Sequence, residues 1–553
     1  MYENICGITP LNFTKIIPEV SNYIFTKDPS FIPITLKNFF GSVVQVNSFE
    51  ECYYYAELGW SNSKITIFEI GQYFVIFLFT LIFLYVTKKN SGLIKSIISK
   101  SRLKLSISSL YKFFINTLII FQLIIAFRYI KNKSINLKPF IDEYVSISSN
   151  YHLLTGLDFN AGQFLGGPFS VYLTSGPLAS LGSVIGWIST NNIFYARIFN
   201  YYWVVTLLLI STITLNRKFQ FNTKHYLIFV GVISFLFPWW QGYLYSLGEV
   251  PSMIVLLTAI LLFHKNKKLS LALFGFSIFL GKFLNFLLFF TFYLAVFIQL
   301  RNSKMLFRDI ISFLVPLAPW FILIHITYSG GGLYTYFNDL YLFISDSSAS
   351  GLQEESRLNF SYLKNSILQS EYSSWNIYEK VRIGVLPLLG ISLIAKNRKL
   401  LDSKFGNISF PIIFSFFSVY LWFWILNQLK WMRYSQHFTV FIILLILYLI
   451  IFEIYENKID YLFSSILIVL YVDNTKKYLI YYLIILLLIY VIKNINNYKL
   501  ILVITTSLIL TFDISYSIFT KENKSVPNLE IIDCNITLNT DACRSSYFDI
   551  LNE

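Results

Sequence analysis

Long uncharged apolar runs recur along this chain and constrain its fold more than any other feature. The first run, GQYFVIFLFTLIFLYVT at 71–87, has no charged residue, and further apolar runs with few charges follow as far as 499–515. Each approaches the roughly 20 residues that a helix needs to cross a bilayer. With 55% hydrophobic and 13% charged residues in 553, a water-soluble fold could not bury this much apolar surface. The sequence therefore predicts an all-α polytopic membrane protein, a bundle of about 12–14 transmembrane helices.

Basic residues set the predicted orientation of the spans. Segment 88–112 carries seven Lys or Arg and no Asp or Glu, so the positive-inside rule places it in the cytoplasm. The loops 131–198 and 329–381 then lie on the outer face. We expect no cleavable signal peptide, because the N-terminus lacks a basic stretch followed by a short apolar one. The net charge of +14 is explained by cytoplasmic loops and anionic lipid, and not by nucleic acid.

These assignments divide the chain into four consecutive segments. They are an extracytoplasmic segment 1–68, a main transmembrane region 69–455, C-terminal transmembrane helices 456–515 and an extracytoplasmic tail 516–553. In the first large outer loop, SGPLASLGSVIGWIST at 175–190 is predicted to form an amphipathic helix on the membrane surface or dipping into it. A full span there would reverse every later orientation, and the downstream charges argue against it.

The four cysteines all fall in segments that the charges place outside. Disulfides persist in oxidising compartments, so the pairs Cys6–Cys52 and Cys534–Cys543 are predicted. Four free thiols are the alternative. No Cys/His spacing resembles a zinc site.

Ionisable residues gather on the predicted outer face. Such groups are costly at membrane depth and therefore suggest function, although those at helix ends can extend towards water. A carboxylate can act as a base on an acceptor hydroxyl or amine, and Arg or Lys can hold a phosphate. Both signs together predict group transfer from a lipid-phosphate donor, although a proton-coupled transporter would use them too. The candidates are Asp142, Glu143, His152, Asp158, Arg197, Glu249, Lys282, Lys430, Arg433, Tyr434 and His437.

The order of these motifs resembles that of the GT-C superfamily of membrane glycosyltransferases, including its protein O-mannosyltransferase and ArnT-like branches. The likeness covers roughly residues 113–455, with the span at 71–87 and segment 1–68 as additions before it. Each motif is short, and their shared order and outer placement carry the likeness. The similar stretches are IDEYVSISSNYHLLTGLDF at 141–159, YARIFN with Arg197, SLGEVPSM with Glu249, LGKFLNF with Lys282 and KWMRYSQHF at 430–438.

The resemblance implies a GT-C-like bundle with amphipathic surface helices in the first outer loop. It implies transfer of a hexosyl or pentosyl group from a polyprenyl-phosphate donor to a lipid, glycan or protein acceptor. The site would face the extracytoplasmic side of a bacterial plasma membrane. Some members need a divalent cation such as Mg²⁺ or Mn²⁺, whose ligands are not assigned here.

The resemblance also implies roles for the candidates. Asp142 or Glu143 would be the catalytic base. Adjacent helical residues point about 100° apart, so only one is expected to face the reacting centre, and the family pattern favours Asp142. Glu249 would position the sugar or acceptor. The other candidate donor-binding residues are Arg197, Lys282 and Arg433 as phosphate contacts, with Tyr434, His152 and Asp158.

Three other functions remain open at this point. A transporter or flippase favours inverted repeats and broken helices, but the sequence shows no internal repeat, and Pro238, Pro316 and Pro319 form no symmetric pattern. A polymerase or ligase of lipid-linked glycans would use the same kind of donor. A non-catalytic scaffold is the third. Nucleophile-elbow, P-loop and zinc-protease motifs are absent from the sequence.

Overall fold

The computed structural model describes part of the chain. Among the predicted site residues, Asp142, His152 and Asp158 lie outside the described residues, as do Cys6, Cys534 and Cys543, and only the backbone of Arg433 is described. The described residues are 34–37, 43–46, 48, 51–52, 54–55, 117, 121–122, 124–125, 128–130, 134, 143, 146–147, 150, 173–190, 193–219, 240–300, 304–328, 332–345, 377–427, 432–452, 454–455, 457–472, 479–491, 502 and 504–512.

The chain separates into two compact units, each described by itself. One comprises residues 1–138, 224–235 and 461–532, and the other comprises 139–223, 236–460 and 533–553. The second unit holds every described residue of the predicted donor and acceptor site. The four predicted segments 1–68, 69–455, 456–515 and 516–553 were defined by their side of the membrane, and this division stays a prediction.

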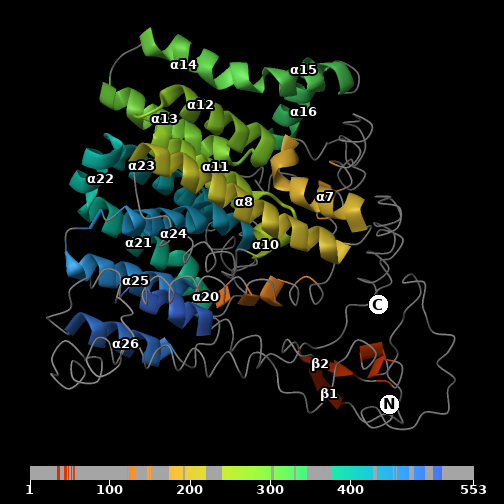
Figure 1. Ribbon diagram of the computed structural model, residues 1–553. Helices are drawn as coiled ribbons and strands as arrows, with labels where there is room; N and C mark the ends of the chain where they lie inside the picture. The colour runs from red at the N-terminus through yellow and green to blue at the C-terminus, as the bar shows by residue number, and fades with distance from the viewer. Residues whose placement is uncertain are drawn as a thin grey trace, which may run out of the picture. The chain divides into compact units, whose positions relative to one another are not determined.

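Helices dominate the described residues, as the composition predicts. Figure 1 draws them as coiled ribbons, together with one small hairpin in which β1 (Ile34–Lys37) pairs antiparallel with β2 (Val43–Val46). The helices are α7 (Leu181–Thr190), α8 (Ile193–Phe219), α10 (Trp240–Leu244), α11 (Glu249–Leu262), α12 (Lys267–Gly275), α13 (Asn285–Leu300), α14 (Lys304–Leu314), α15 (Ala318–Thr327), α16 (Leu333–Ser345), α20 (Ile377–Gly384), α21 (Leu386–Lys396), α22 (Arg398–Phe405), α23 (Ser409–Leu421), α24 (Gln436–Ile451), α25 (Lys458–Val472) and α26 (Leu479–Val491). Short 3₁₀ or π turns are η5 (Pro177–Ala179), η6 (Phe276–Gly281), η7 (Val315–Leu317), η8 (Trp422–Leu426) and η9 (Met432–Ser435).

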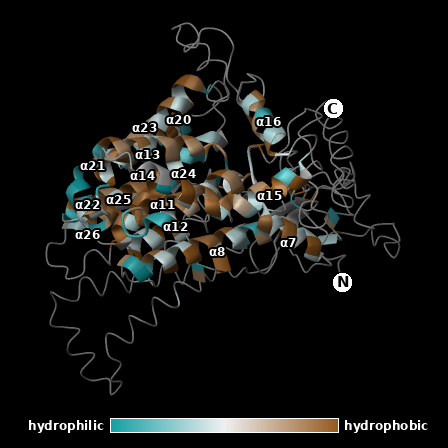
Figure 2. Cartoon of the chain, turned by 90° about the horizontal axis from the view of Figure 1, so that it is seen from above, coloured by the Kyte–Doolittle hydropathy of each residue, from teal (hydrophilic) through white to brown (hydrophobic). Residues whose placement is uncertain are grey.

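Three described helical stretches are long and apolar enough to cross a membrane. They are Tyr195–Phe219, Arg308–Ile326 and Ser409–Leu426. Shorter apolar helices, such as Glu249–Leu262 and Gln436–Ile450, accompany them, and hydrophobic residues cover much of α8 in Figure 2. The protein is thus a helical polytopic membrane protein, as predicted, with the short β1–β2 hairpin as an element that the sequence did not predict. The total number of spans stays a prediction.

Helix α11 lies at the centre of the second unit and is buried along nearly its whole length. It packs against α8, α12 and α24. Inside this bundle the Ser211 hydroxyl lies 2.5 Å from the Thr258 hydroxyl and 2.9 Å from that of Tyr448, which ties α8, α11 and α24 together by hydrogen bonds. Because its first residue is Glu249, α11 brings a carboxylate to one end of this buried bundle.

The predicted surface helix at 175–190 forms η5 and α7. The ten residues of α7 extend about 15 Å, too short to cross the hydrocarbon core. Helix α7 packs closely on α8, since a Cβ at Gly186 would lie 2.8 Å from the Cα of Ala196. Its placement at the membrane surface stays a prediction.

Helix α8 differs from the predicted third span at 201–215. It begins at Ile193, so Arg197 lies inside the helix and not before it. The charged residue was expected to lie outside the span, but the fully buried Glu143 carboxylate pairs with Arg197, which allows the helix to continue through this position.

The segment 267–300 forms the predicted helical hairpin. Helices α12 and α13 lie side by side, with the ring of Phe274 4.9 Å from that of Phe289. Lys282 lies in the turn after η6. The Gly176 amide donates to the Gly281 carbonyl at 2.9 Å, which joins this turn to the segment before α7.

Replacing Gly176 by Ala is expected to destabilise the protein. The added Cβ would lie 2.4 Å from the carbonyl oxygen of Phe279 and 2.6 Å from the Cα of Leu280, and backbone atoms cannot move away as a side-chain tip can. Overpacking of this kind typically costs about 1–3 kcal/mol. The thermal midpoint in detergent should fall. Gly384→Ala is the matched control, because its Cβ would meet only Trp424, at 3.7 Å; an equal drop in both variants would contradict this account.

Candidate functional site

Glu143 and Arg197 form a fully buried ion pair. The Arg197 Nε donates to Glu143 Oε1 at 2.6 Å, and its Nη2 donates to Oε2 at 2.7 Å. Both side chains are 0% exposed, and the guanidinium also lies over the ring of Tyr245, 5.2 Å from its centroid. This two-point geometry occupies both carboxylate oxygens. The resemblance implied separate roles for these two residues, which lie 54 positions apart, and the structure brings them together.

Uncharged polar side chains hold the same region in place, and the sequence did not single them out. The Asn150 amide donates to the Ser146 carbonyl at 2.9 Å and also to the Ser180 hydroxyl. The Asn200 amide donates to the Tyr243 carbonyl. Buried amides of this kind leave no charge pattern in a sequence. Their presence within apolar stretches is the one feature that could have marked them.

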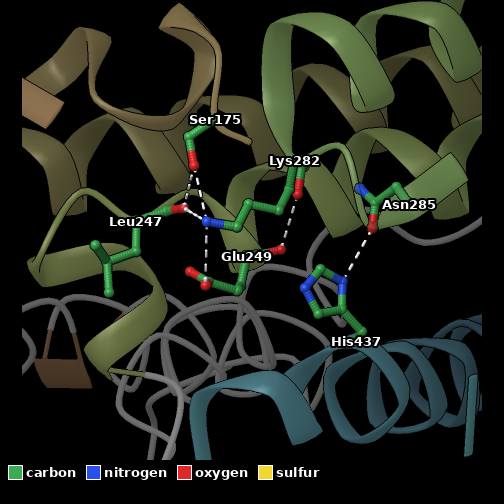
Figure 3. A network of polar contacts seen from close by, with 7 residues as sticks. Ser175, Leu247, Glu249, Lys282, Asn285 and His437 are labelled. Carbon is green, nitrogen blue, oxygen red and sulfur yellow. Dashed lines mark hydrogen bonds and ion pairs between the residues drawn. The ribbon is translucent and has the colours of Figure 1, made fainter. Parts of the chain in front are cut away.

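Lys282 lies at the meeting point of three chain segments (Figure 3). Its ammonium donates to the Ser175 hydroxyl at 2.8 Å and to the Leu247 carbonyl at 3.1 Å, and it lies 3.6 Å from Glu249 Oε1. Gly248 allows the chain before α11 to lie close against η5. Its φ is +89°, which suits glycine, and a Cβ there would lie 2.5 Å from that of Ala179.

Glu249 is buried beside this lysine. Its side chain is 0% exposed, yet neither carboxylate oxygen accepts a hydrogen bond among the described residues. Its position in the first turn of α11 places the negative charge at the positive end of the helix dipole. The dipole and the Lys282 ammonium together offset its charge. The structure therefore unites two sequence candidates, Glu249 and Lys282.

His437 joins the same region through Asn285. Its Nδ1 lies 3.1 Å from the Asn285 Oδ1, while its Nε2 is buried and has no hydrogen-bond partner among the described residues. The Asn285 amide donates to the Ser277 hydroxyl at 2.8 Å, and that hydroxyl donates to the Ser252 carbonyl at 3.0 Å. This chain of bonds links α24 to α13, η6 and α11. Asn285, Ser277 and Ser252 were not predicted.

The remaining predictions concern single residues and a metal. Tyr434 is partly buried, with its ring 6.1 Å from that of Trp422. Cys52 is disulfide-bonded, and because the other three cysteines lie outside the described residues, the pairing with Cys6 stays a prediction. Within the described ranges no three His, Cys, Asp or Glu side chains are grouped to hold a metal ion. A requirement for Mg²⁺ or Mn²⁺ stays a prediction without assigned ligands.

Comparisons with known proteins add one distant likeness. No protein-family model matches the chain, and no curated protein matches it. The fold is similar to the crystal structure of ArnT from Cupriavidus metallidurans in the apo state, with a TM-score of 0.43 and 11% sequence identity over 74% of this chain and 77% of that one.

Proposed function

We propose that this protein is a membrane glycosyltransferase that moves a sugar from a polyprenyl-phosphate donor to a lipid, glycan or protein acceptor. The reaction takes place at the extracytoplasmic face. The supporting observation is that motifs far apart in the sequence meet within one unit. Glu143 contacts Arg197, Lys282 contacts Glu249, and three residues after Lys282, Asn285 contacts His437.

Asp142 is the proposed general base. Glu143 is held at both oxygens by Arg197, and a carboxylate in such a pair is a poor proton acceptor. Asp142 takes the proton from the acceptor hydroxyl or amine. The acceptor atom then attacks the anomeric carbon, the bond from that carbon to the phosphate oxygen breaks, and polyprenyl phosphate leaves with the bonding electrons. Direct displacement of this kind inverts the anomeric configuration.

Arg433 is the proposed phosphate contact. Arg197 and Lys282 were also candidates, but Arg197 is paired with Glu143, and the Lys282 ammonium is engaged by Ser175, Leu247 and Glu249. A guanidinium can donate two hydrogen bonds to a phosphate that gains negative charge as it leaves. Arg433 lies in η9, four residues before His437.

A deletion strain tests this function through its surface glycans and lipids. Mass spectrometry should show one sugar missing from an envelope component and restored by the wild-type gene. A flippase would leave the donor chemically intact, so purified protein in liposomes should also release free polyprenyl phosphate when membrane extract supplies the acceptor. Unchanged glycans together with an intact donor would refute the proposal and favour transport or a scaffold.

Lys282→Met is expected to lower the transfer rate by about 10²-fold per folded protein, because the catalytic geometry depends on Glu249 and on the segment at Ser175, both held by this ammonium. Lys396→Met is the matched control. Lys396 likewise pairs with a buried carboxylate, Asp460, at 2.5 Å, but it makes no contact with this site. Lys282→Met should lose more stability, because Lys282 is 12% exposed and Lys396 is 54% exposed. Activity per folded protein should be lost only in Lys282→Met. Equal activity in both would contradict the assignment.

A further inference from the structure

Among the described residues, three buried acceptor atoms beside the turn at Lys282 have no hydrogen-bond partner. They are the two carboxylate oxygens of Glu249 and the Nε2 of His437. Glu249 is 1% exposed and His437 is 0% exposed. Buried polar atoms are nearly always hydrogen-bonded, so their gathering at one place indicates a site that a ligand completes. Figure 3 shows Glu249 paired with Lys282 and His437 paired with Asn285, three residues further along the same turn.

The hydrogen bonds that connect Ser252 to His437 determine whether the Nε2 of His437 is a donor or an acceptor. The Ser277 hydroxyl gives its proton to the Ser252 carbonyl, so it accepts from the Asn285 amide nitrogen. That orientation turns the Asn285 Oδ1 towards His437, and an oxygen acceptor there requires a proton on Nδ1. The Nε2 of the neutral ring therefore presents a lone pair. All three unsatisfied atoms accept hydrogen bonds and donate none.

The local charges favour a neutral ligand. A cation would lie beside the Lys282 ammonium, which is 3.6 Å from Glu249 Oε1 and acts electrostatically on His437. An anion such as phosphate would lie against the Glu249 carboxylate. Lys282 already donates to Ser175 and Leu247. A ligand that carries several hydroxyl groups supplies donors without adding charge.

We propose that Glu249 and His437 form the subsite for the sugar of the donor, where they accept hydrogen bonds from its ring hydroxyls. This subsite rests on the proposed function for the identity of the donor. The sugar is then recognised by Glu249 and His437, and the phosphate is recognised by Arg433. Glu249, which the resemblance assigned to either the sugar or the acceptor, is here assigned to the sugar. His437 is assigned to sugar specificity through its Nε2.

Binding to purified protein in nanodiscs tests the subsite, with undecaprenyl phosphate and undecaprenyl-phosphate glucose or mannose as probes. Wild-type protein should bind at least one sugar-bearing lipid about tenfold more tightly than bare undecaprenyl phosphate, as expected for a hydrogen bond to a charged acceptor. Glu249→Gln should lose most of this sugar-dependent gain and keep its affinity for the bare lipid.

Two substitutions of His437 separate binding from structure. In His437→Asn the amide can still donate to Asn285, but the acceptor at the Nε2 position is gone, so the sugar-dependent gain should disappear. In His437→Gln an amide oxygen can replace Nε2, so part of the gain should return. Their thermal midpoints show whether each variant is folded.

The outcomes distinguish the subsite from the proposed function. If the variants weaken both kinds of lipid equally, or neither, the sugar subsite is refuted while the lipid-phosphate donor stands. The same holds if wild type binds the bare and sugar-bearing lipids equally. If wild type binds none of these lipids, the proposed donor is refuted and the subsite with it.

Discussion

Asp142→Asn is expected to lower sugar transfer by about 10²–10⁴-fold, the usual contribution of a general base. Asn has nearly the same shape as Asp but cannot take the acceptor proton at this step. Binding of the lipid-phosphate donor should persist, because the base acts on the acceptor. The measurement is donor consumption in liposomes, normalised to folded protein.

Glu143→Gln is the paired control for this experiment. It also removes a carboxylate from the acidic pair, but that carboxylate is bound to Arg197. Activity per folded protein should therefore be retained far better in Glu143→Gln than in Asp142→Asn, although less protein folds. The reverse order would make Glu143 the base and would contradict the assignment.

The Glu143–Arg197 pair is expected to show strong coupling in a double-mutant cycle. Glu143→Met and Arg197→Met each break this pair and leave its other charged side chain buried, since both side chains are 0% exposed. Breaking such a pair costs about 3–5 kcal/mol. Removing both charges together, as Glu143→Met with Arg197→Met, should recover much of this loss. Unfolding in detergent, followed by heat or denaturant, measures the free energies.

The same cycle tests whether Arg197 instead contacts the phosphate of the donor. In that case Arg197→Met would lower activity with little loss of stability. Adding Glu143→Met would restore neither the activity nor the stability. Additive stability losses in the double variant would mean that the two residues do not act as a pair.

The transmembrane fold was predictable because apolar runs and basic loops act locally. The run at 409–427 predicted a span, and the structure has a helical stretch there, Ser409–Leu426, that is long and apolar enough for one. The hairpin around Lys282 was equally local, because its turn follows directly from two adjacent apolar segments. The start of α8 was not predictable in this way. Arg197 lies inside the helix, where a carboxylate 54 residues earlier pairs with its charge.

The candidate site was predictable for its charged residues and not for its connections. Glu249, Lys282 and His437 were noticeable as ionisable groups between apolar segments. The sequence contains no indication that Lys282 engages Glu249, or that Asn285 fixes the orientation of His437. Such contacts depend on how helices pack, and uncharged partners such as Ser175 and Ser277 do not stand out from other serines in an apolar chain.

The most direct test of the central claim is the fate of the donor during the reaction. Purified protein in liposomes should convert a radiolabelled undecaprenyl-phosphate sugar into free undecaprenyl phosphate and a labelled acceptor, when membrane extract supplies that acceptor. Asp142→Asn should abolish both products. The protein used must be one that restores the deletion strain. If the donor is then recovered intact, whether or not it has crossed the bilayer, the result would contradict glycosyl transfer.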